Sequence, residues 1–371
     1  MKDGLSRLIY EKAVIPYLNQ KCRQVVAMDK RDRLGLEHDS KGRFTKKDGS
    51  NPETGVAFAL KYVDPKQLEA VRKVGNYTTS DGVKHDTRIN VVTGKPISKE
   101  LNDAIDALMS GVYVTDAEIG RTPEWIKARA ELKAHKAAVR KKNGVVFTNE
   151  IDTPERNKMR KDIEEHFMSD TIDEGLNPDA FKSNPDLKPF KVKKGKIIDV
   201  ITGLPAAGKS TTFATRLSVE NGSRLIDSDE VKKQFPEFNK GLGASLVHEE
   251  SSAIAKNILV RSIAQGDNIT YPIIGFKPDK LRELFSYCRK NGYQIRLHLN
   301  ELDMRKAKGR MLLRFAERGR FLPISLYRKY GDNPTTAYHE VKGETDFHDW
   351  YQSDTGAGKK PKLMESVTVI K

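Results

Sequence analysis

A glycine-rich octapeptide constrains the fold of this 371-residue chain more than any other feature. Residues 203–210, GLPAAGKS, fit the spacing G-x-x-x-x-G-K-[ST]. They follow an apolar, β-branched run at 195–201 and lead into a helix-like segment at 210–220. Glycines let the backbone curl so that successive N–H groups point at phosphate oxygens, and the helix N-terminus adds its positive end. The sequence therefore predicts a strand, a loop and a helix that together bind a nucleoside triphosphate.

The residues of this loop have distinct predicted roles. Lys209 is expected to reach the β- and γ-phosphates of ATP, and the Ser210 hydroxyl is expected to ligate Mg²⁺. The alternative is a strand-to-helix turn that binds no ligand, which the context on both sides disfavours. ATP and Mg²⁺ are the predicted cofactors, and the predicted ATP contacts are Gly203, Leu204, Pro205, Ala206, Ala207, Gly208, Lys209, Ser210 and Thr211.

Two aspartates follow the next predicted strand. Asp229 comes 20 residues after Lys209, and Asp227 precedes it by two. Parallel strands end at the edge of the sheet where open α/β folds bind ligands. We predict that Asp229 accepts the proton of a substrate hydroxyl and that Asp227 holds the metal together with Ser210. The alternative for either carboxylate is that it caps the helix that follows.

An arginine-rich segment lies at 305–320. Arg310, Arg314 and Arg318 recur every four residues and so share one helical face, and the segment ends in Arg320-Phe321-Leu322-Pro323. Guanidinium groups on a lid over the triphosphate would offset the charge that develops during transfer. We predict that at least two of Arg310, Arg314 and Arg320 contact phosphate. A solvated basic face or an RNA contact is the alternative. The predicted catalytic residues are Asp229, Lys209, Arg310, Arg314 and Arg320.

Strand-like and helix-like segments alternate in the second half of the chain, which predicts an α/β fold with a parallel sheet of about five strands and flanking helices. The predicted strands span 195–201, 223–227, 268–274, 294–300 and 366–370. The first half is predicted to be mainly helical and partly irregular, with helices at 98–110, 122–141 and 153–168. We divide the chain into an N-terminal region at 1–169, a linker at 170–190 and a phosphate-loop domain at 191–371.

The formal net charge of +15 is unevenly distributed. Residues 1–190 hold 34 basic and 30 acidic side chains, whereas residues 191–371 hold 32 and 21. The excess therefore accompanies the phosphate loop and favours an anion pocket, with nucleic acid as a weaker alternative. No run of 18 apolar residues and no secretory signal is present, and two lone cysteines exclude a disulfide framework. We expect a cytoplasmic protein without a membrane partner.

Together with His248-Glu249-Glu250 at the start of a long predicted helix, these motifs resemble the zeta-toxin family of P-loop kinases, in a variant branch, over about residues 193–371. The resemblance implies that the γ-phosphoryl group of ATP passes to a hydroxyl of a small nucleotide-linked metabolite. That metabolite would be a UDP-N-acetylglucosamine-like sugar nucleotide, or NAD as for a related effector. It also implies that Asp229, Glu249 and Glu250 bind the substrate, and that the protein acts as a toxin or as an effector delivered to a host cell.

The family's separate antitoxins imply an antitoxin or chaperone partner, or restraint in cis by residues 1–190. This chain departs from better-known members at Tyr271-Pro272-Ile273-Ile274-Gly275, where they carry an acid-Gly-Thr-like motif, so its substrate stays open. One alternative is a 5′-hydroxyl polynucleotide kinase, which would use the basic charge on phosphate backbones. Another is a non-catalytic nucleotide-binding interaction module of a phage or mobile element.

Overall fold

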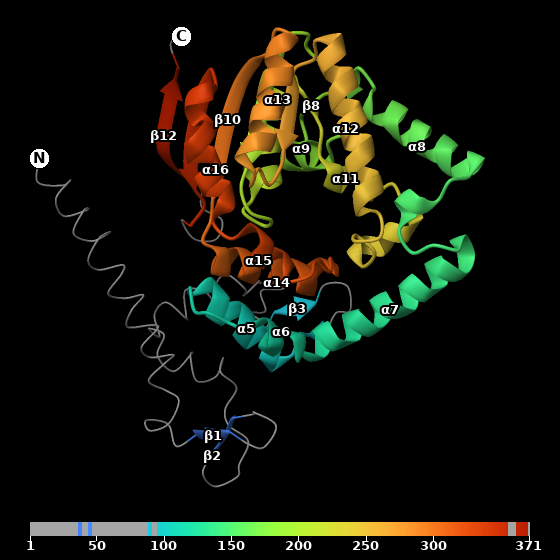
Figure 1. Ribbon diagram of the computed structural model, residues 1–371, viewed down its shortest axis with the longest axis vertical. Coiled ribbons are helices and arrows are strands. Elements are labelled where there is room, and N and C mark those ends of the chain that lie inside the picture. The colour runs from blue at the N-terminus through green and yellow to red at the C-terminus, as the bar shows by residue number, and fades with distance from the viewer. Residues whose placement is uncertain (1–35, 39–43, 47–87, 91–94, 355–360, 370–371) are drawn as a thin grey trace, which may run out of the picture. The chain divides into compact units, whose positions relative to one another are not determined.

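The computed structural model describes residues 36–38, 44–46, 88–90, 95–354 and 361–369 (Figure 1). The chain separates into one unit over Met1–Phe58 and a second over Ala59–Lys371. In the first unit the described residues form two antiparallel strands, β1 (Leu36–His38) and β2 (Phe44–Lys46). The second unit contains all the remaining elements, and every site discussed below lies within it.

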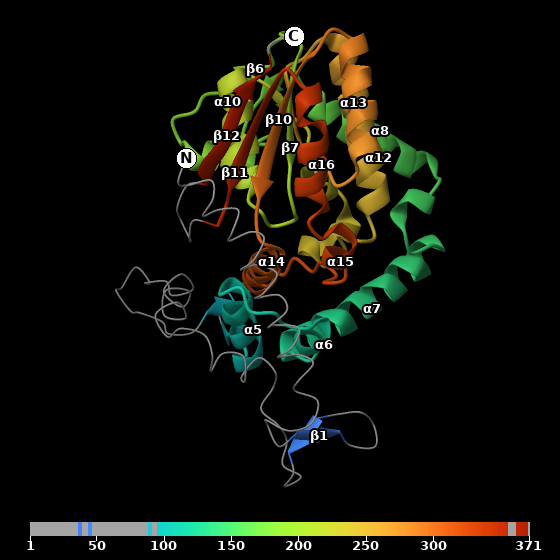
Figure 2. The same cartoon turned by 60° about the vertical axis from the view of Figure 1, so that its left-hand side comes forward.

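A six-stranded sheet in the order β12-β11-β10-β7-β9-β8 organises the second unit (Figure 2). Five strands are parallel and β12 runs antiparallel to β11. Strand β7 is buried almost throughout, as expected of a parallel strand covered on both faces. The α/β fold is therefore confirmed. The strands are β7 (Ile197–Thr202), β8 (Arg224–Leu225), β9 (Ile269–Pro272), β10 (Gln294–Glu301), β11 (Phe347–Gln352) and β12 (Lys362–Thr368).

The sheet differs from the prediction at one edge. The sequence prediction omitted β11, because its buried positions include the polar His348 and Asp349, which obscure the apolar pattern of a central strand. The strand predicted at 366–370 is β12, which spans Lys362–Thr368 and pairs antiparallel with β11. The sheet thus has five parallel strands, as expected, and one antiparallel edge strand.

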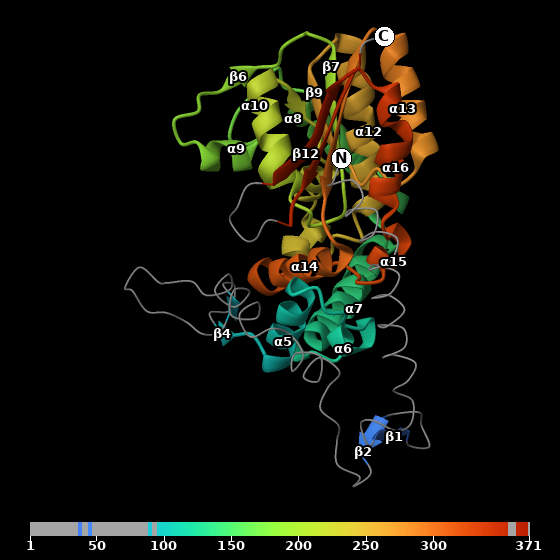
Figure 3. The ribbon, with the colours of Figure 1, turned by 90° about the vertical axis from the view of Figure 1, so that its left-hand side faces the viewer.

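Helices cover both faces of the sheet. Figure 3 shows α12, α13 and α16 on one face and α10 on the other. No helix among the described residues is long and apolar enough to cross a membrane. The helices and helical turns of this region are η3 (Lys209–Ala214), α10 (Thr215–Asn221), α11 (Ser228–Lys232), η4 (Pro236–Gly241), α12 (His248–Gln265), α13 (Pro278–Lys290), α14 (Met304–Arg318), α15 (Leu326–Tyr330) and α16 (Asn333–Val341).

The described part of the N-terminal region is mainly helical, as predicted. Its helices are α5 (Lys99–Met109), α6 (Asp116–Gly120), α7 (Pro123–Asn143) and α8 (Pro154–Phe167). Helix α8 begins as the sequence indicated, because Thr153 Oγ1 accepts a hydrogen bond from Arg156 N and Pro154 occupies the first turn.

The segment at 170–190 connects this region to the sheet. Strands β5 (Thr171–Ile172) and β6 (Phe190–Lys191) pair antiparallel, and α9 (Pro178–Ser183) lies between them. Ile172 and Leu176 belong to the same buried cluster as Ile198 and Val200 of β7. How the chain divides into domains stays a prediction.

Buried ion pairs join helix α8 to η4 and α12. Arg156 Nη2 lies 2.5 Å from Glu250 Oε2 of α12, and Arg156 Nη1 lies 3.1 Å from Glu237 Oε2 of η4. Arg160 Nε donates to Glu250 Oε1 at 2.7 Å. The Arg156 side chain is only 6% exposed, so these contacts are shielded from solvent. One arginine therefore links α8 to two elements that lie 81 and 94 residues further along the chain.

Replacing Arg156 with alanine should lower the free energy of unfolding by roughly 3–5 kcal/mol, because it leaves buried carboxylates without their main counter-charge. Urea denaturation measures the loss. Lys158→Ala is the matched control on the same helix, since Lys158 is 76% exposed, pairs with Asp162, and should cost less than about 1 kcal/mol. Equal losses for the two variants would contradict the structural role of Arg156.

A second buried charge cluster crosses three strands of the sheet. His298 Nδ1 on β10 lies 2.7 Å from Asp349 Oδ1 on β11, and His298 Nε2 lies 3.1 Å from Asp199 Oδ1 on β7. A histidine whose two nitrogens both face carboxylates donates from both, and so is an imidazolium. Burial alone would lower the pKa of His298, but the two aspartates outweigh it and raise the pKa to about 9.

This cluster predicts that stability falls in alkaline solution. Since the pKa of His298 rises from 6.5 to about 9 on folding, its contribution is complete below pH 6.5 and is lost as the pH rises through 9. The free energy of unfolding should fall by on the order of 3 kcal/mol over that window. Urea denaturation from pH 6 to 10 tests this. His298→Gln should flatten the profile, whereas His166→Gln, at an exposed position of α8, should leave it unchanged. A slope that persists in His298→Gln would refute the assignment.

Candidate active site

The phosphate loop leaves β7 in a tightly curled conformation. Gly203, Ala206 and Gly208 all have positive φ, at 143°, 64° and 97°. A Cβ at Gly203 would overlap the carbonyl oxygen of Asn300 on β10, so only glycine fits there. Asn300 Nδ2 also donates to Ala207 O at 2.9 Å. Strand β10 therefore holds both ends of the curl, and the local conformation agrees with the predicted phosphate-binding loop.

Lys209 lies inside this curl. Its ammonium group donates to the carbonyl oxygens of Gly203 at 2.7 Å and of Leu204 at 2.9 Å. Burial lowers the pKa of Lys209 to about 8, although Asp227 and Asp229 act in the opposite direction. The positive charge expected to meet phosphate thus lies within the loop, where both predicted carboxylates act on it.

Ser210 and Asp227 adjoin one another at the start of η3 and α11. Ser210 Oγ donates to Asp227 Oδ2 at 3.1 Å. Neighbouring ligands of an octahedral Mg²⁺ ion lie about 3 Å apart, and Mg²⁺ prefers oxygen ligands, so this pair fits the cation. Burial, followed by the charge of Asp229, raises the pKa of Asp227 to about 6. A cation here would be compatible with both the geometry and the charge.

The alternative of a helix cap also holds for Asp227. Its Oδ1 accepts a hydrogen bond from Asp229 N at 2.9 Å, which caps α11. The cap uses Oδ1 and the contact with Ser210 uses Oδ2, so the Asp227 carboxylate makes both interactions at once. The cap fixes the orientation of the oxygen that faces the loop.

Asp229 is held through both of its oxygens. Lys232 Nζ donates to Oδ1 at 2.8 Å and Arg320 Nη2 donates to Oδ2 at 2.5 Å. Burial alone would raise the pKa of Asp229, but Lys232 and Arg320 outweigh it and hold that pKa well below its usual range. The side chain remains 36% exposed. The carboxylate is therefore oriented by two cations and partly exposed to solvent.

The predicted lid arginines meet the site in different ways. Arg310 Nη2 donates to Ser353 O at 2.8 Å, and its Nη1 lies 3.5 Å from Ala207 O of the phosphate loop. The charges of Arg314 and Arg320 both act to lower the pKa of Lys209. The structure thus brings Arg310 to the loop and Arg320 to Asp229. Their contact with phosphate stays a prediction.

The two glutamates of the resemblance are placed differently from each other. Glu250 is 3% exposed and pairs with Arg156 and Arg160 of α8, whereas Glu249 is exposed. The carboxylate of Glu250 is therefore occupied within the protein. A substrate role for either glutamate stays a prediction. The side chain of Thr211, a predicted ATP contact, lies outside the described part of the chain.

Sequence reasoning missed two residues of the site. Lys232, which is 9% exposed, was not singled out, although its spacing of three from Asp229 on a helix would have indicated contact. Tyr327 of α15 donates through its hydroxyl to Pro205 O at 2.9 Å. That contact joins positions 122 residues apart, and no local pattern signals it.

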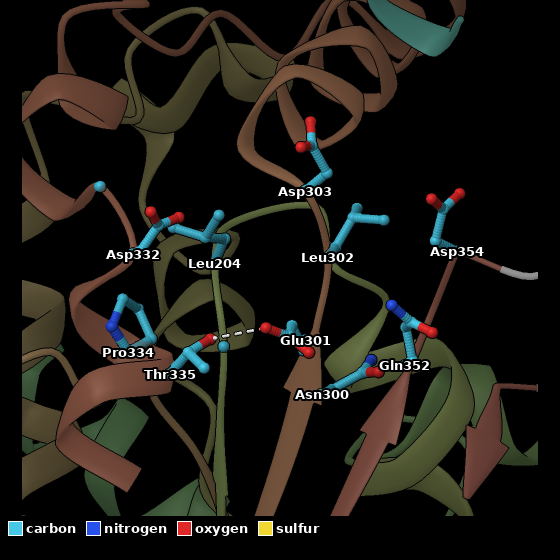
Figure 4. Close-up of a pocket in the computed structure, with 12 residues that line it drawn as sticks. Leu204, Asn300, Glu301, Leu302, Asp303, Asp332, Pro334, Thr335, Gln352 and Asp354 are labelled. Carbon is cyan, nitrogen blue, oxygen red and sulfur yellow. Dashed lines mark hydrogen bonds between the residues drawn. The ribbon is translucent and has the colours of Figure 1, made fainter. Parts of the chain in front are cut away.

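A pocket of about 320 Å³ adjoins the phosphate loop. Figure 4 shows acidic side chains around it, from β10 and from the segments beside it. Glu301, one of these, accepts hydrogen bonds from Trp350 Nε1 at 2.9 Å and from Thr335 Oγ1 at 3.4 Å. Lys209 and Asp229 do not line the pocket, so it lies beside the predicted chemistry. Its lining residues are Gly203, Leu204, Asn300, Glu301, Leu302, Asp303, Gly331, Asp332, Pro334, Thr335, Gln352 and Asp354.

Gly203→Ala should disrupt the loop, because the added methyl group meets Asn300 O and the residue keeps a φ of 143°. A backbone strain of about 1–3 kcal/mol corresponds to roughly a 5- to 150-fold loss of Mg·ATP affinity, measured by calorimetry. Gly343→Ala is the control, since a Cβ there meets nothing within 4 Å. Unchanged affinity in Gly203→Ala would argue against this loop as the ATP site.

Comparison with known proteins identifies the region that contains this site. A family model described as zeta toxin matches residues 184–351, which include the phosphate loop, Asp229 and Arg320. No curated protein sequence matches the chain.

Similar solved structures include one from the PezAT chromosomal toxin–antitoxin system of the human pathogen Streptococcus pneumoniae. It has 13% identity and a TM-score of 0.41, over 58% of this chain and 82% of that chain. Another is the AvrRxo1-ORF1:-ORF2 complex, with 14% identity and a TM-score of 0.40, over 59% and 69%. The AvrRxo1-ORF1:-ORF2 structure with ATP has 13% identity and a TM-score of 0.36, over the same shares. The match of the family model confirms the resemblance to the zeta-toxin family over residues 184–351.

Proposed function

We propose that this protein is an ATP-dependent kinase of the zeta-toxin type, which transfers the γ-phosphoryl group to a hydroxyl of a small nucleotide-linked metabolite. The observation that carries the proposal is the position of Asp229. Its ionised carboxylate is fixed by Lys232 and Arg320 and stands close to the loop lysine and to the Ser210–Asp227 pair. The family match over residues 184–351 supports a toxin kinase.

Each group has one role in the proposed reaction. Lys209 binds the β- and γ-phosphates, and Ser210 and Asp227 would hold Mg²⁺. Bound Mg²⁺ supplies charge neutralisation for the triphosphate. As the acceptor oxygen forms a bond to the γ-phosphorus, the bond from that phosphorus to the β–γ bridging oxygen breaks and ADP leaves. Asp229 takes the hydroxyl proton, and the lid arginines offset the charge on the transferred group.

The substrate and biological role follow from the family resemblance. We propose a UDP-N-acetylglucosamine-like sugar nucleotide or NAD as acceptor, and a toxin or effector role in the cytoplasm of the producing cell or of a host cell. An antitoxin or chaperone would restrain it, or the N-terminal region would do so in cis. The basic excess of residues 191–371 favours one second candidate, a 5′-hydroxyl polynucleotide kinase.

Incubation with [γ-³²P]ATP, Mg²⁺ and a panel of UDP-N-acetylglucosamine, NAD and a 5′-hydroxyl oligonucleotide tests the proposal. One small molecule should acquire label. Asp229→Asn should lower kcat about 10²- to 10⁴-fold, because no carboxylate then takes the proton of the substrate hydroxyl. Lys209→Ala should also abolish labelling.

Asp162→Asn is the control, since this carboxylate on α8 is 61% exposed and has no role in the proposed reaction. Label on the oligonucleotide alone would establish the polynucleotide kinase. If nothing acquires label in a manner that depends on Lys209 and Asp229, the kinase proposal fails, and retained ATP binding would then favour a nucleotide-binding interaction module.

A further inference from the structure

We propose that Trp125, on α7 of the N-terminal region, is a positioning residue that sets the location of Arg320 at Asp229. The inference rests on the proposed kinase function. It assigns to the N-terminal helices a part in building the active site, in addition to any regulation. Three sets of contacts carry it, on the two sides of Arg320 and along the lid helix.

On one side, an aromatic cluster holds the residue next to Arg320. Phe321 and Phe315 each have 7% of their surface exposed, and Trp125 has 5%. The Trp125 ring centroid lies 4.5 Å from that of Phe321 and 5.1 Å from that of Phe315. Such ring pairs contribute about 0.5–1.5 kcal/mol beyond the area they bury. Because Arg320 and Phe321 are consecutive, the seat of Phe321 limits where the Arg320 backbone lies.

On the other side, η4 lies directly against the Arg320 backbone. A Cβ at Gly241 would lie only 2.9 Å from Arg320 Cα, so the backbones of these two segments touch without a side chain between them. Helix α7 also reaches η4, where His135 Nε2 lies 2.8 Å from Glu237 O. Helix α7 thus contacts the segments on both sides of Arg320. Trp125 packs on Phe321, and His135 contacts η4.

The lid helix α14 is held from the same side. A Cβ at Gly309 would lie 3.0 Å from Met109 Cγ of α5, which indicates close packing of the two helices. Asp116 of α6 pairs with Lys308 Nζ at 3.5 Å and with Arg328 Nη2 at 2.6 Å. Figure 1 shows α5, α6 and α7 gathered beside α14. The N-terminal helices therefore support the lid before and after the loop that presents Arg320.

This support matters because Arg320 acts at short range. Its Nη2 lies 2.5 Å from Asp229 Oδ2, and its charge also reaches Lys209. A misplacement of about 1 Å at a reacting centre can cost about 100-fold in rate. Trp125 is not itself at the site, so any kinetic effect of its loss has to pass through Phe321 or Phe315, and the proposed route runs through Phe321 to Arg320.

A double-mutant cycle on the full chain tests the proposal, with the Kd for Mg·ATP from calorimetry and kcat for the acceptor labelled in the panel. Trp125→Ala and Arg320→Gln should each lower kcat, by about 10-fold or more, and Trp125→Ala in the Arg320→Gln background should add less than about 2-fold. Trp125→Phe should recover kcat to within about 3-fold of the unmodified chain. Ile126→Ala is the control, since Ile126 neighbours Trp125 and is 55% exposed.

Multiplicative effects of the two substitutions would overturn the proposal, as would unchanged kcat in Trp125→Ala. Thermal unfolding followed by circular dichroism checks that each variant is folded. If Trp125→Ala does not fold, Phe321→Leu replaces it in the same cycle with the same criteria. Failure of the kinase function itself is distinct, because the unmodified chain would then label no acceptor, whether or not it binds Mg·ATP.

Discussion

The close approach of Gly203 to the Asn300 carbonyl is the contact on which the candidate site depends. It fastens the phosphate loop to the neighbouring strand β10, and the Asn300 side chain fastens the loop again at Ala207. The curl then encloses the Lys209 ammonium group and presents Ser210 toward Asp227. A loop free to move away from β10 would lose this arrangement, since its backbone N–H groups converge only while it is curled.

Charge compensation governs the rest of the site. Asp227, Asp229 and Arg320 each act on the pKa of Lys209, and Asp229 and Arg320 act on each other's pKa. Burial raises the pKa of Asp227, whereas at Asp229 the contacts with Lys232 and Arg320 outweigh burial and lower the pKa. Two carboxylates only two residues apart therefore have different electrostatic environments.

The sequence predicted those features that depend on residues close together in the chain. The phosphate loop and the helices α7 and α8 with their first-turn prolines could be read from spacing and residue type. So could the position of Asp229 shortly after a strand, although the strand β8 ends at Leu225 and Asp229 lies in the first turn of α11. Strand β11 could not, because its buried Asp349 is paired with His298 of another strand. Nor could the partners of Glu250, since Arg156 lies 94 residues away and no periodicity encodes such a contact.

The basic excess has a more specific explanation in the structure than in the sequence. Several cations of the lid region have acidic partners, such as Lys306 with Asp354 and Lys308 with Asp116. The net charge of this segment is therefore partly balanced by contacts within the protein, including one with the N-terminal helices. Composition alone could not distinguish a paired cation from one available to phosphate.

The apolar cluster that crosses the boundary between the two halves bears on how such a chain could be assembled in evolution. Ile163 and Phe167 of α8, with Ile172 and Leu176 beyond it, share one core with strands β7 and β10. A kinase segment exchanged between genes without α8 would arrive with part of its interior missing. A segment that carries its whole core therefore begins upstream of the zeta-toxin match, which starts at residue 184.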